Sequence, residues 1–368
     1  MSPLHIFRSK MNELEHHYSV IDEKNWPRNE RRRLKKDLKA IYERDGFIDT
    51  RAFDPGYRWN LCATRLRDLD FNYDGWEFRS DWAATFRGFN GFRTKVPLWD
   101  GKPVGKLIVL GEQGVGDEIL FASALPDLMV RVGKGIEFKT YPRLMPVFER
   151  SYRIKCTERQ ALGKISDGDA LVALSDLFPW YRRDVSHFPK KPFLKPDPEK
   201  VEVWTKRLRK YGERPKIGIA FHSRHGSVSP EDLKTDNASC PDANASCPDA
   251  KDALYVNLQY QNPDKGRFHI PEWLHQEDID LWNDIDGTFA LVAALDKVHS
   301  VTQTIVHIAG SQGKECHAVI PPRNGEANWF LWYHEAREKE HLDRWQHLIY
   351  GSVTLYKDIH EFRNRSPV

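Results

Sequence analysis

Residues 106–125 read KLIVLGEQGVGDEILFASAL, and this stretch decides the fold. Lys106–Leu110 is a short apolar run of the kind that forms a buried parallel strand. The glycine-rich segment 111–118 follows, and the apolar-periodic run 119–132 predicts a helix. A strand, a glycine-rich turn and a helix in this order open a Rossmann-like βαβ unit. The sequence therefore predicts an α/β domain that begins here.

The same alternation recurs in the second half of the chain. Further strands are predicted at Ile136–Thr140, Ala170–Ala173, Lys216–Phe221, Tyr255–Gln259, Val298–Val301 and Cys316–Ile320, and helices at 287–295 and 303–312. The segment PKKPFLKPDP (189–198) separates the two series and reads as an interdomain connection. We therefore predict two doubly wound α/β domains, 96–195 and 196–368, which face each other across a cleft.

The N-terminal region, residues 1–95, shows no alternating strand pattern and is predicted to be helical. Residues 57–82 suggest a helix pair that faintly resembles one degenerate tetratricopeptide repeat. The basic run NERRRLKKDLKAIYERD (29–45) predicts a helix with a solvated charged face rather than a phosphate site. NASCPDA occurs twice in tandem, at 237–243 and 244–250, and predicts an exposed loop.

Composition narrows the class of protein. Hydrophobic residues make up 40% and charged residues 30%, which is typical of a folded globular chain. A formal net charge of +3 gives no argument for nucleic-acid binding. The five cysteines form no CxxC pair, so neither a disulfide framework nor a zinc site is indicated. No apolar run is long enough to span a membrane and no signal peptide is evident, so we expect a cytoplasmic setting.

Two candidates for general acid–base chemistry lie in the first strand-to-helix junction. Gly114 and Gly116 permit a close backbone approach to a ligand, although the spacing is neither that of a dinucleotide fingerprint nor that of a P-loop. Asp117 stands where the helix begins, either as its N-cap or as a general base at the carboxyl edge of the sheet. Glu112 is the second candidate for the base.

The second junction carries hydroxyl groups and an imidazole. Thr302 and Thr304 lie where a strand gives way to a helix, whose N-terminal N–H groups suit a diphosphate. His307 follows three residues later on the same helix face, where it is either packed or functional. Ser223 and Gln259 end neighbouring predicted strands, and each either lines the same cleft or is an ordinary turn residue.

No metal ligand set and no resident cofactor are predicted. Asp278-Ile-Asp280 and Asp284-Ile-Asp286 fall in a loop before a helix, and Asp286 is interpreted as a helix cap. HEAREKEH (334–341) departs from the HExxH spacing of zinc proteases.

Five segments together resemble the catalytic region of bacterial tetratricopeptide-repeat glycosyltransferases, relatives of the heptosyltransferases and, more distantly, of O-GlcNAc transferase. They are PLWDGKPVGKLIVLGEQGVGDEILFASALPDL, IGIAFHS, LYVNLQY, DIDGTFALVAALDKVHSV and TIVHIAGSQGK, spread over roughly residues 90–350. The resemblance implies a GT-B fold and an inverting, metal-independent transfer from a nucleotide-sugar donor bound by the C-terminal domain. It also implies that Asp117 is the base and that His307, with the hydroxyls before it, binds the nucleotide.

One departure from that family concerns Thr302-Gln303, where many relatives carry Asp-Thr or Asp-Ser. The repeated NASCPDA loop also replaces a region that often supplies a phosphate-contacting cation, for which Arg224 and Lys234 are candidates. The main alternative is therefore a non-catalytic module that binds a nucleotide sugar or a glycan. An NAD-dependent enzyme is disfavoured because the fingerprint is missing. The acceptor stays open between a surface glycan, a protein, a lipid-linked sugar and a modified nucleic-acid base.

Overall fold

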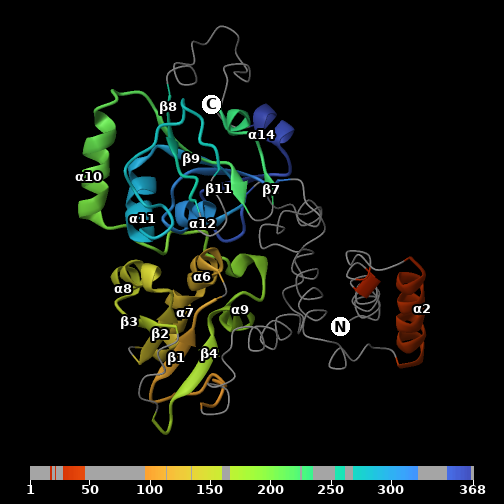
Figure 1. Ribbon diagram of the computed structural model, residues 1–368. Coiled ribbons are helices and arrows are strands. Elements are labelled where there is room, and N and C mark those ends of the chain that lie inside the picture. The colour runs from red at the N-terminus through yellow and green to blue at the C-terminus, as the bar shows by residue number, and fades with distance from the viewer. Residues whose placement is uncertain are drawn as a thin grey trace.

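The computed structural model contains two α/β domains, one above the other in Figure 1. The structure describes residues 17, 18, 21, 28–45, 96–112, 114–133, 135–159, 166–223, 226–234, 253–261, 268–321 and 346–365. The predicted basic helix is α2 (Arg28–Asp45), on which Arg32, Arg33 and Lys36 are exposed. The predicted helix pair at 57–82 and both NASCPDA copies lie outside the described residues.

The first domain is built on a parallel sheet with the strand order β3-β2-β1-β4 among the described residues. Its strands are β1 (Leu107–Leu110), β2 (Ile136–Thr140), β3 (Lys155–Glu158) and β4 (Ala170–Ala173). Its helices are α6 (Val115–Phe121), α7 (Leu125–Val132), α8 (Met145–Tyr152) and α9 (Phe178–Tyr181), with 3₁₀ turns at Ala122–Ala124, Pro142–Leu144, Leu174–Leu177 and Val185–His187. All four side chains of β1 are buried, which explains its uninterrupted apolar sequence.

The second domain has a parallel sheet in the order β11-β10-β9-β5-β8. Its strands are β5 (Lys216–Ala220), β8 (Leu254–Asn257), β9 (Lys297–Val301), β10 (Cys316–Val319) and β11 (Val353–Tyr356), beside a small hairpin of β6 (His222–Ser223) and β7 (Gly226–Ser227). Its helices are α10 (Pro198–Arg209), α11 (Ile285–Ala294), α12 (Thr304–Ser311) and α14 (Ile359–Arg365), with a 3₁₀ turn at Pro230–Leu233. The predicted α/β class with two parallel sheets is confirmed.

The predicted strands form within two residues of their expected ends. The helix predicted over 119–132 instead begins at Val115, as α6, and a 3₁₀ turn at Ala122–Ala124 separates α6 from α7. The strand predicted to run to Gln259 ends at Asn257, because the Asn257 side chain accepts a hydrogen bond from the Gln259 backbone and turns the chain. The helix predicted from Gln303 begins at Thr304, and Gln303 is its N-cap with extended backbone.

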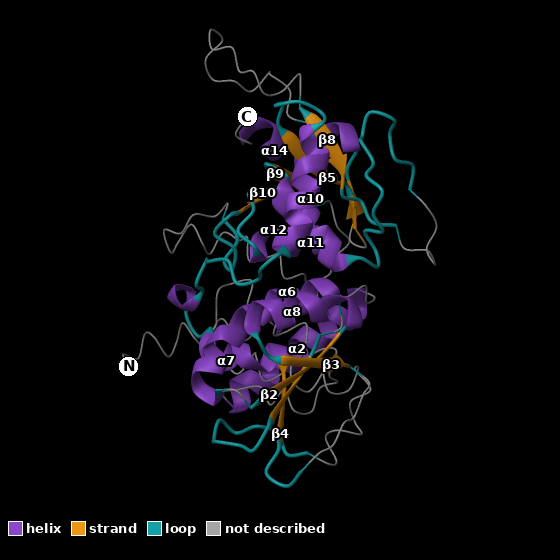
Figure 2. Cartoon of the chain, turned by 90° about the vertical axis from the view of Figure 1, so that its left-hand side faces the viewer, coloured by secondary structure: helices purple, strands orange, loops and turns teal. Residues whose placement is uncertain are grey.

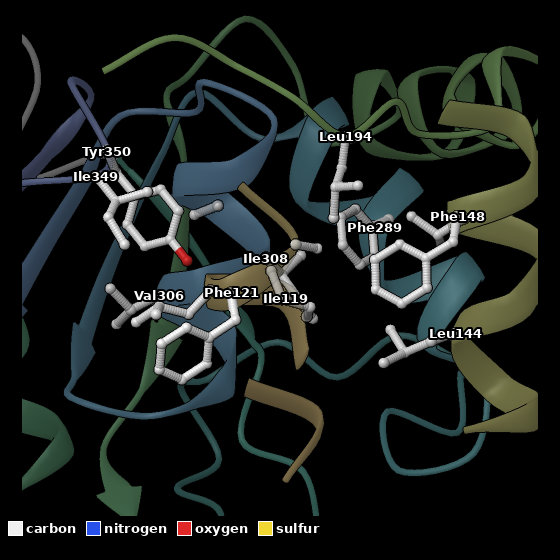
Figure 3. Close-up of a cluster of buried hydrophobic side chains, with 14 of the residues drawn as sticks. Ile119, Phe121, Leu144, Phe148, Leu194, Phe289, Val306, Ile308, Ile349 and Tyr350 are labelled. Atoms are coloured by element: carbon white, nitrogen blue, oxygen red, sulfur yellow. The ribbon is translucent and has the colours of Figure 1, made fainter. Parts of the chain in front are cut away.

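The two domains share one apolar core, which closes the centre of the cleft expected between them. Figure 3 shows Ile119 and Phe121 of α6 beside Val306 and Ile308 of α12. In the same core, Phe289 of α11 faces Leu144, just before α8, and Phe148 within α8. Figure 2 shows the same arrangement from the side, with α6 and α8 against α11 and α12.

The middle of the proline-rich connection is hydrogen-bonded to both domains, so it is not a loose hinge. Phe193 and Leu194 donate backbone hydrogen bonds to the Ser311 carbonyl of the second domain. Lys195 donates to the Ser151 hydroxyl of the first domain at 2.9 Å. The relative placement of the domains is therefore fixed by packing and by the connection together. None of the helices in the described part of the chain has the length and apolarity to cross a bilayer.

Candidate functional site

Each sheet has a topological switch point, where the order of strands reverses and where ligands bind in open α/β sheets. In the first sheet it lies between β1 and β4, and in the second between β5 and β9. The junction that follows β1 leads into α6, and the junction that follows β9 leads into α12. The structure brings these two junctions into contact.

Gly116 is the point at which they meet. A Cβ atom at this position would lie 2.9 Å from Cδ2 of His307 and 3.5 Å from Oγ1 of Thr304. The first distance is shorter than real Cβ contacts, so a glycine is required for the two helix ends to approach this closely. Gly116, Thr304 and His307, which the sequence places in different domains, therefore share one site.

Asp117 lies in the first turn of α6, but it is not the N-cap. The N-cap is Gly114, so the capping interpretation of Asp117 was wrong. The Asp117 carboxylate instead folds back toward the loop, where a Cβ at Gly114 would lie 3.0 Å from Oδ2. Asp117 is half-buried, and its charge reaches across the domain boundary to the Tyr350 phenol.

His307 forms a buried pair with Tyr350, a residue that sequence reasoning missed. Nδ1 of His307 lies 2.9 Å from the Tyr350 hydroxyl. Burial lowers the pKa of His307 to about 3, so the imidazole is neutral at physiological pH. Burial, and to a lesser degree the charges of Tyr152 and Asp117, raise the pKa of Tyr350 well above its usual range. Tyr350 lies 43 residues beyond its partner in a segment with no motif, so no sequence pattern pointed to it.

Glu112 is buried at the switch point of the first sheet. Its Oε1 accepts a hydrogen bond from the Ser175 backbone N–H at 2.9 Å. Glu112 follows β1 and Ser175 follows β4, so this bond joins the two strand ends on either side of the switch point.

Glu118 is the third carboxylate of this junction, and the sequence analysis did not single it out. It accepts hydrogen bonds from the Thr140 hydroxyl and from the Tyr141 backbone N–H, the latter at 3.4 Å. Arg159 Nε lies 3.7 Å from its other oxygen. Burial outweighs these stabilising contacts and raises the pKa of Glu118 to about 8. Its only sequence signal is its place directly after Asp117.

Gln259 and Ser223 are engaged by the protein itself. Oε1 of Gln259 accepts hydrogen bonds from the backbone of Phe221 at 3.0 Å and of His222 at 2.8 Å, while Nε2 donates to the Tyr260 carbonyl at 3.1 Å. The Ser223 hydroxyl donates to the Gly226 carbonyl at 3.3 Å, across the β6–β7 hairpin. These bonds favour the turn-residue interpretation of both side chains.

Thr302 and Gln303 follow β9 as Gln259 follows β8, but the protein does not engage their side chains in the same way. Thr302 is 0% exposed and Gln303 is 5% exposed. Within the described part of the chain, neither Oγ1 of Thr302 nor either amide atom of Gln303 has a hydrogen-bond partner. The side chain of Gln303 does not cap α12.

Aromatic and arginine side chains line one flank of the domain boundary. Arg143 donates to the Trp282 carbonyl and lies 4.6 Å from the centre of that ring. Arg159 lies 4.2 Å from the Tyr141 ring centre, and Tyr260 lies 5.4 Å from Trp282. This chain of contacts joins the carboxyl ends of β2 and β8.

Three aspartates of the two Asp-x-Asp triplets, Asp280, Asp284 and Asp286, make structural contacts within the protein. Asp284, and not Asp286 as predicted, is the N-cap of α11, and it accepts from the Gly287 N–H at 2.7 Å. Asp286 instead forms ion pairs with Arg150 and with Lys200. Asp280 accepts from the backbone N–H groups of Trp282 and Asn283. In the portion of the chain that is described, no three His, Cys, Asp or Glu side chains are grouped as metal ligands.

The two candidate phosphate-contacting cations have different outcomes. Lys234 lies 3.5 Å from the centre of the Trp273 ring, in a cation–π contact. Arg224 lies outside the described residues.

Comparison with known proteins gives one clear sequence relative. No family model matches the chain. Protein FlbA of Caulobacter vibrioides is 28% identical over 314 residues, which are 75% of this chain, and the chain spans half of that protein's length. Among solved structures, the chain is similar to a glycosyl transferase of family 9 from Veillonella parvula (TM-score 0.42, 11% identity, 63% of this chain and 85% of that one). It is also similar to the ADP-heptose lipopolysaccharide heptosyltransferase II of E. coli (TM-score 0.38, 12% identity, 68% and 90%).

Proposed function

We propose that the protein is a glycosyltransferase of GT-B type, which moves a sugar from a nucleotide-sugar donor to an acceptor hydroxyl with inversion and without a metal ion. The observation that carries the proposal is the contact between the two switch-point junctions. One junction presents the carboxylate of Asp117, and the other presents the N-terminus of α12 with Thr304 and His307. A base and an anion site therefore face each other across Gly116.

The donor diphosphate is assigned to the N-terminus of α12. The first N–H groups of a helix and its dipole favour an anion. No side chain in the described part of the chain caps α12, whereas the side chains of Asp197 and Asp284 cap α10 and α11. The Val306 N–H donates to the Gln303 carbonyl at 3.0 Å, so the N–H groups of Thr304 and Ile305 are the ones assigned to the ligand. The same two groups would stabilise the charge that develops on the leaving diphosphate. The Thr304 hydroxyl is placed to add a further donor.

Asp117 is assigned as the general base. An inverting transfer needs one base to take the proton of the acceptor hydroxyl as that oxygen attacks the sugar. The other two carboxylates suit this step less well. Glu112 is engaged by the Ser175 backbone, and the raised pKa of Glu118 keeps it protonated near neutral pH.

A non-catalytic module that binds a nucleotide sugar is the second candidate. Two observations favour it: the apolar core that closes the centre of the cleft, and the uncharged Thr302 where the resemblance leads one to expect a carboxylate. Both functions share the donor site, and only turnover separates them.

A donor screen followed by a turnover assay tests the proposal. We expect at least one nucleotide sugar to raise the melting temperature, because a ligand of the native state stabilises it by mass action. We then expect that donor to be consumed, by transfer or slow hydrolysis, at the same rate in EDTA as without it. Binding without consumption would establish the non-catalytic module. Turnover lost in EDTA and restored by manganese would overturn the metal-independent mechanism.

A further inference from the structure

Two buried glutamines follow β8 and β9, the strands on either side of β5, and differ in their hydrogen bonding. Gln259 follows β8, is 1% exposed, and has both amide atoms bonded to backbone groups. Gln303 follows β9, is 5% exposed, and has neither amide atom bonded within the described residues. Thr302, beside it, is fully buried with its hydroxyl oxygen unbonded in that same part of the chain.

Such an arrangement is costly for folding alone. Nearly all buried polar side chains in native proteins are hydrogen-bonded. A buried amide without partners loses its hydrogen bonds to water and forms none with the protein, which lowers the stability of the folded state. A Met or Leu of similar size would fill the same space without that loss. Buried polar groups that the fold does not satisfy are typical of places where a ligand supplies the partners.

We propose that Gln303, together with Thr302, binds the uncharged, hydroxyl-bearing sugar of the donor rather than its phosphates. This inference rests on the proposed function and deepens it. A glutamine amide presents one acceptor and two donor hydrogens, and a threonine hydroxyl presents both kinds of group. Phosphate oxygens only accept, so they would leave Oε1 of Gln303 unsatisfied. Neighbouring sugar hydroxyls donate and accept, so they match both ends of the amide.

The position of Gln303 suggests that two sets of protein groups bind different parts of the donor. Gln303 is the N-cap of α12, and its side chain does not occupy the helix N–H groups. The Gln303 carbonyl accepts from the Val306 N–H, so the N–H groups of Thr304 and Ile305 remain for the diphosphate. The adjacent neutral side chains remain for the sugar attached to it. The pair therefore acts as a specificity element for the sugar. Gln259, which the sequence left open between lining the cleft and being a turn residue, acts as a structural brace.

The first test measures stability without ligand and compares Gln303→Met with its matched control Gln259→Met. Gln259→Met removes three backbone hydrogen bonds and should lower the melting temperature by about 2 °C or more. Gln303→Met removes an amide that has no hydrogen-bond partner among the described residues, and it should melt at the wild-type temperature or above it. A drop for Gln303→Met as large as that for Gln259→Met would overturn the inference.

The second test measures affinity by calorimetry, with UDP and UDP-N-acetylglucosamine as one probe pair and GDP and GDP-mannose as another. For the pair that binds, Gln303→Met should weaken the sugar nucleotide about tenfold or more and the free diphosphate less than twofold. An equal loss for both probes, or no loss, would overturn the assignment to the sugar. If no nucleotide binds the wild-type protein, the proposed function fails and the ligand class fails with it. The melting temperature of Gln303→Met then shows separately whether the amide is unengaged.

Discussion

The β1–α6 and β9–α12 junctions are the same supersecondary unit, used twice with opposite chemistry. The first carries three carboxylates, of which Glu112 and Glu118 are held by backbone and hydroxyl donors of the protein. The second carries only neutral groups, and those of Thr302 and Gln303 are not held by any described residue. The difference indicates a division of labour: one junction is arranged to take a proton, and the other is arranged to receive a ligand.

What the two junctions share is the apolar contact behind them. Side chains of α6 and α12 pack in one core, and Phe289 of α11 packs against α8 (Figure 3). Close-packed protein interiors leave helices and side chains little freedom to shift. The distance between the base and the helix N-terminus is therefore set by the fold, and a ligand does not have to create it.

Asp117→Asn is the strongest test of whether the first junction supplies the base and the second binds the donor. We expect transfer to slow by a factor of about 10²–10⁴ while the affinity for the donor stays unchanged. Because the N-cap is Gly114, the substitution removes no cap and should leave the melting temperature nearly unchanged. Rates of single-turnover transfer, with Glu112→Gln in parallel, provide the measurement. Wild-type transfer by Asp117→Asn together with inactivity of Glu112→Gln would move the base to Glu112.

Phe289→Ala tests whether one core couples the two junctions. Phe289 is 0% exposed and faces Leu144 and Phe148 of the other domain. Removing a buried phenyl ring costs about 3–5 kcal/mol of unfolding free energy, through lost burial and the cavity left behind. Denaturant unfolding should show that loss, with Val130→Ala, at a site 90% exposed, as the near-neutral control. A loss below about 1 kcal/mol would mean that the domains are held together elsewhere.

The sequence predicted the fold well because buried parallel strands leave an unmistakable pattern. After a leading lysine, KLIVL and KIGIAF contain only apolar residues and one glycine, and each segment forms an interior strand of its sheet. The contact between Gly116 and His307 was only implied, since a glycine does not state what it approaches. Tyr350 and the opposite bonding of Gln259 and Gln303 could not be read at all. They depend on which backbone groups happen to lie near a side chain, and that is a property of tertiary packing. The capping alternative for Asp117 and the assignment of Asp286 as a helix cap were wrong, because each helix begins two or three residues earlier than its aspartate suggested.

Glu118→Gln separates the acidic junction from the neutral one by pH. The folded pKa of Glu118, about 8, lies above its value of 4.5 in an unfolded chain. The protonated carboxyl thus favours folding, in full below about pH 4.5, and this contribution is lost as the pH rises through 8. We expect the wild-type protein to lose stability between pH 5 and 9 by an amount of the order of a few kcal/mol at most. Glu118→Gln, which keeps a neutral side chain, should lose less over the same range in urea titrations. Parallel pH profiles for the two proteins would place the titrating group elsewhere.

The smallest expected change in stability comes from Gly114→Ser, and it sharpens the comparison most finely. Serine is a better N-cap than glycine by only a few tenths of a kcal/mol, so unfolding should shift by less than about 0.5 kcal/mol. The added Cβ would lie 3.0 Å from Oδ2 of Asp117, close enough to make that carboxylate move. If the first junction serves only the base, transfer should slow while calorimetry with the donor gives an affinity within about twofold of wild type. Weaker donor binding would instead show that the α6 loop also holds the donor, and the two junctions would then share one role rather than divide two.

Gly133→Ser is not a usable control because its φ of 73° strains any side chain. Ser186→Ala, at an exposed 3₁₀ turn of the first domain, reports the background effect of a small substitution.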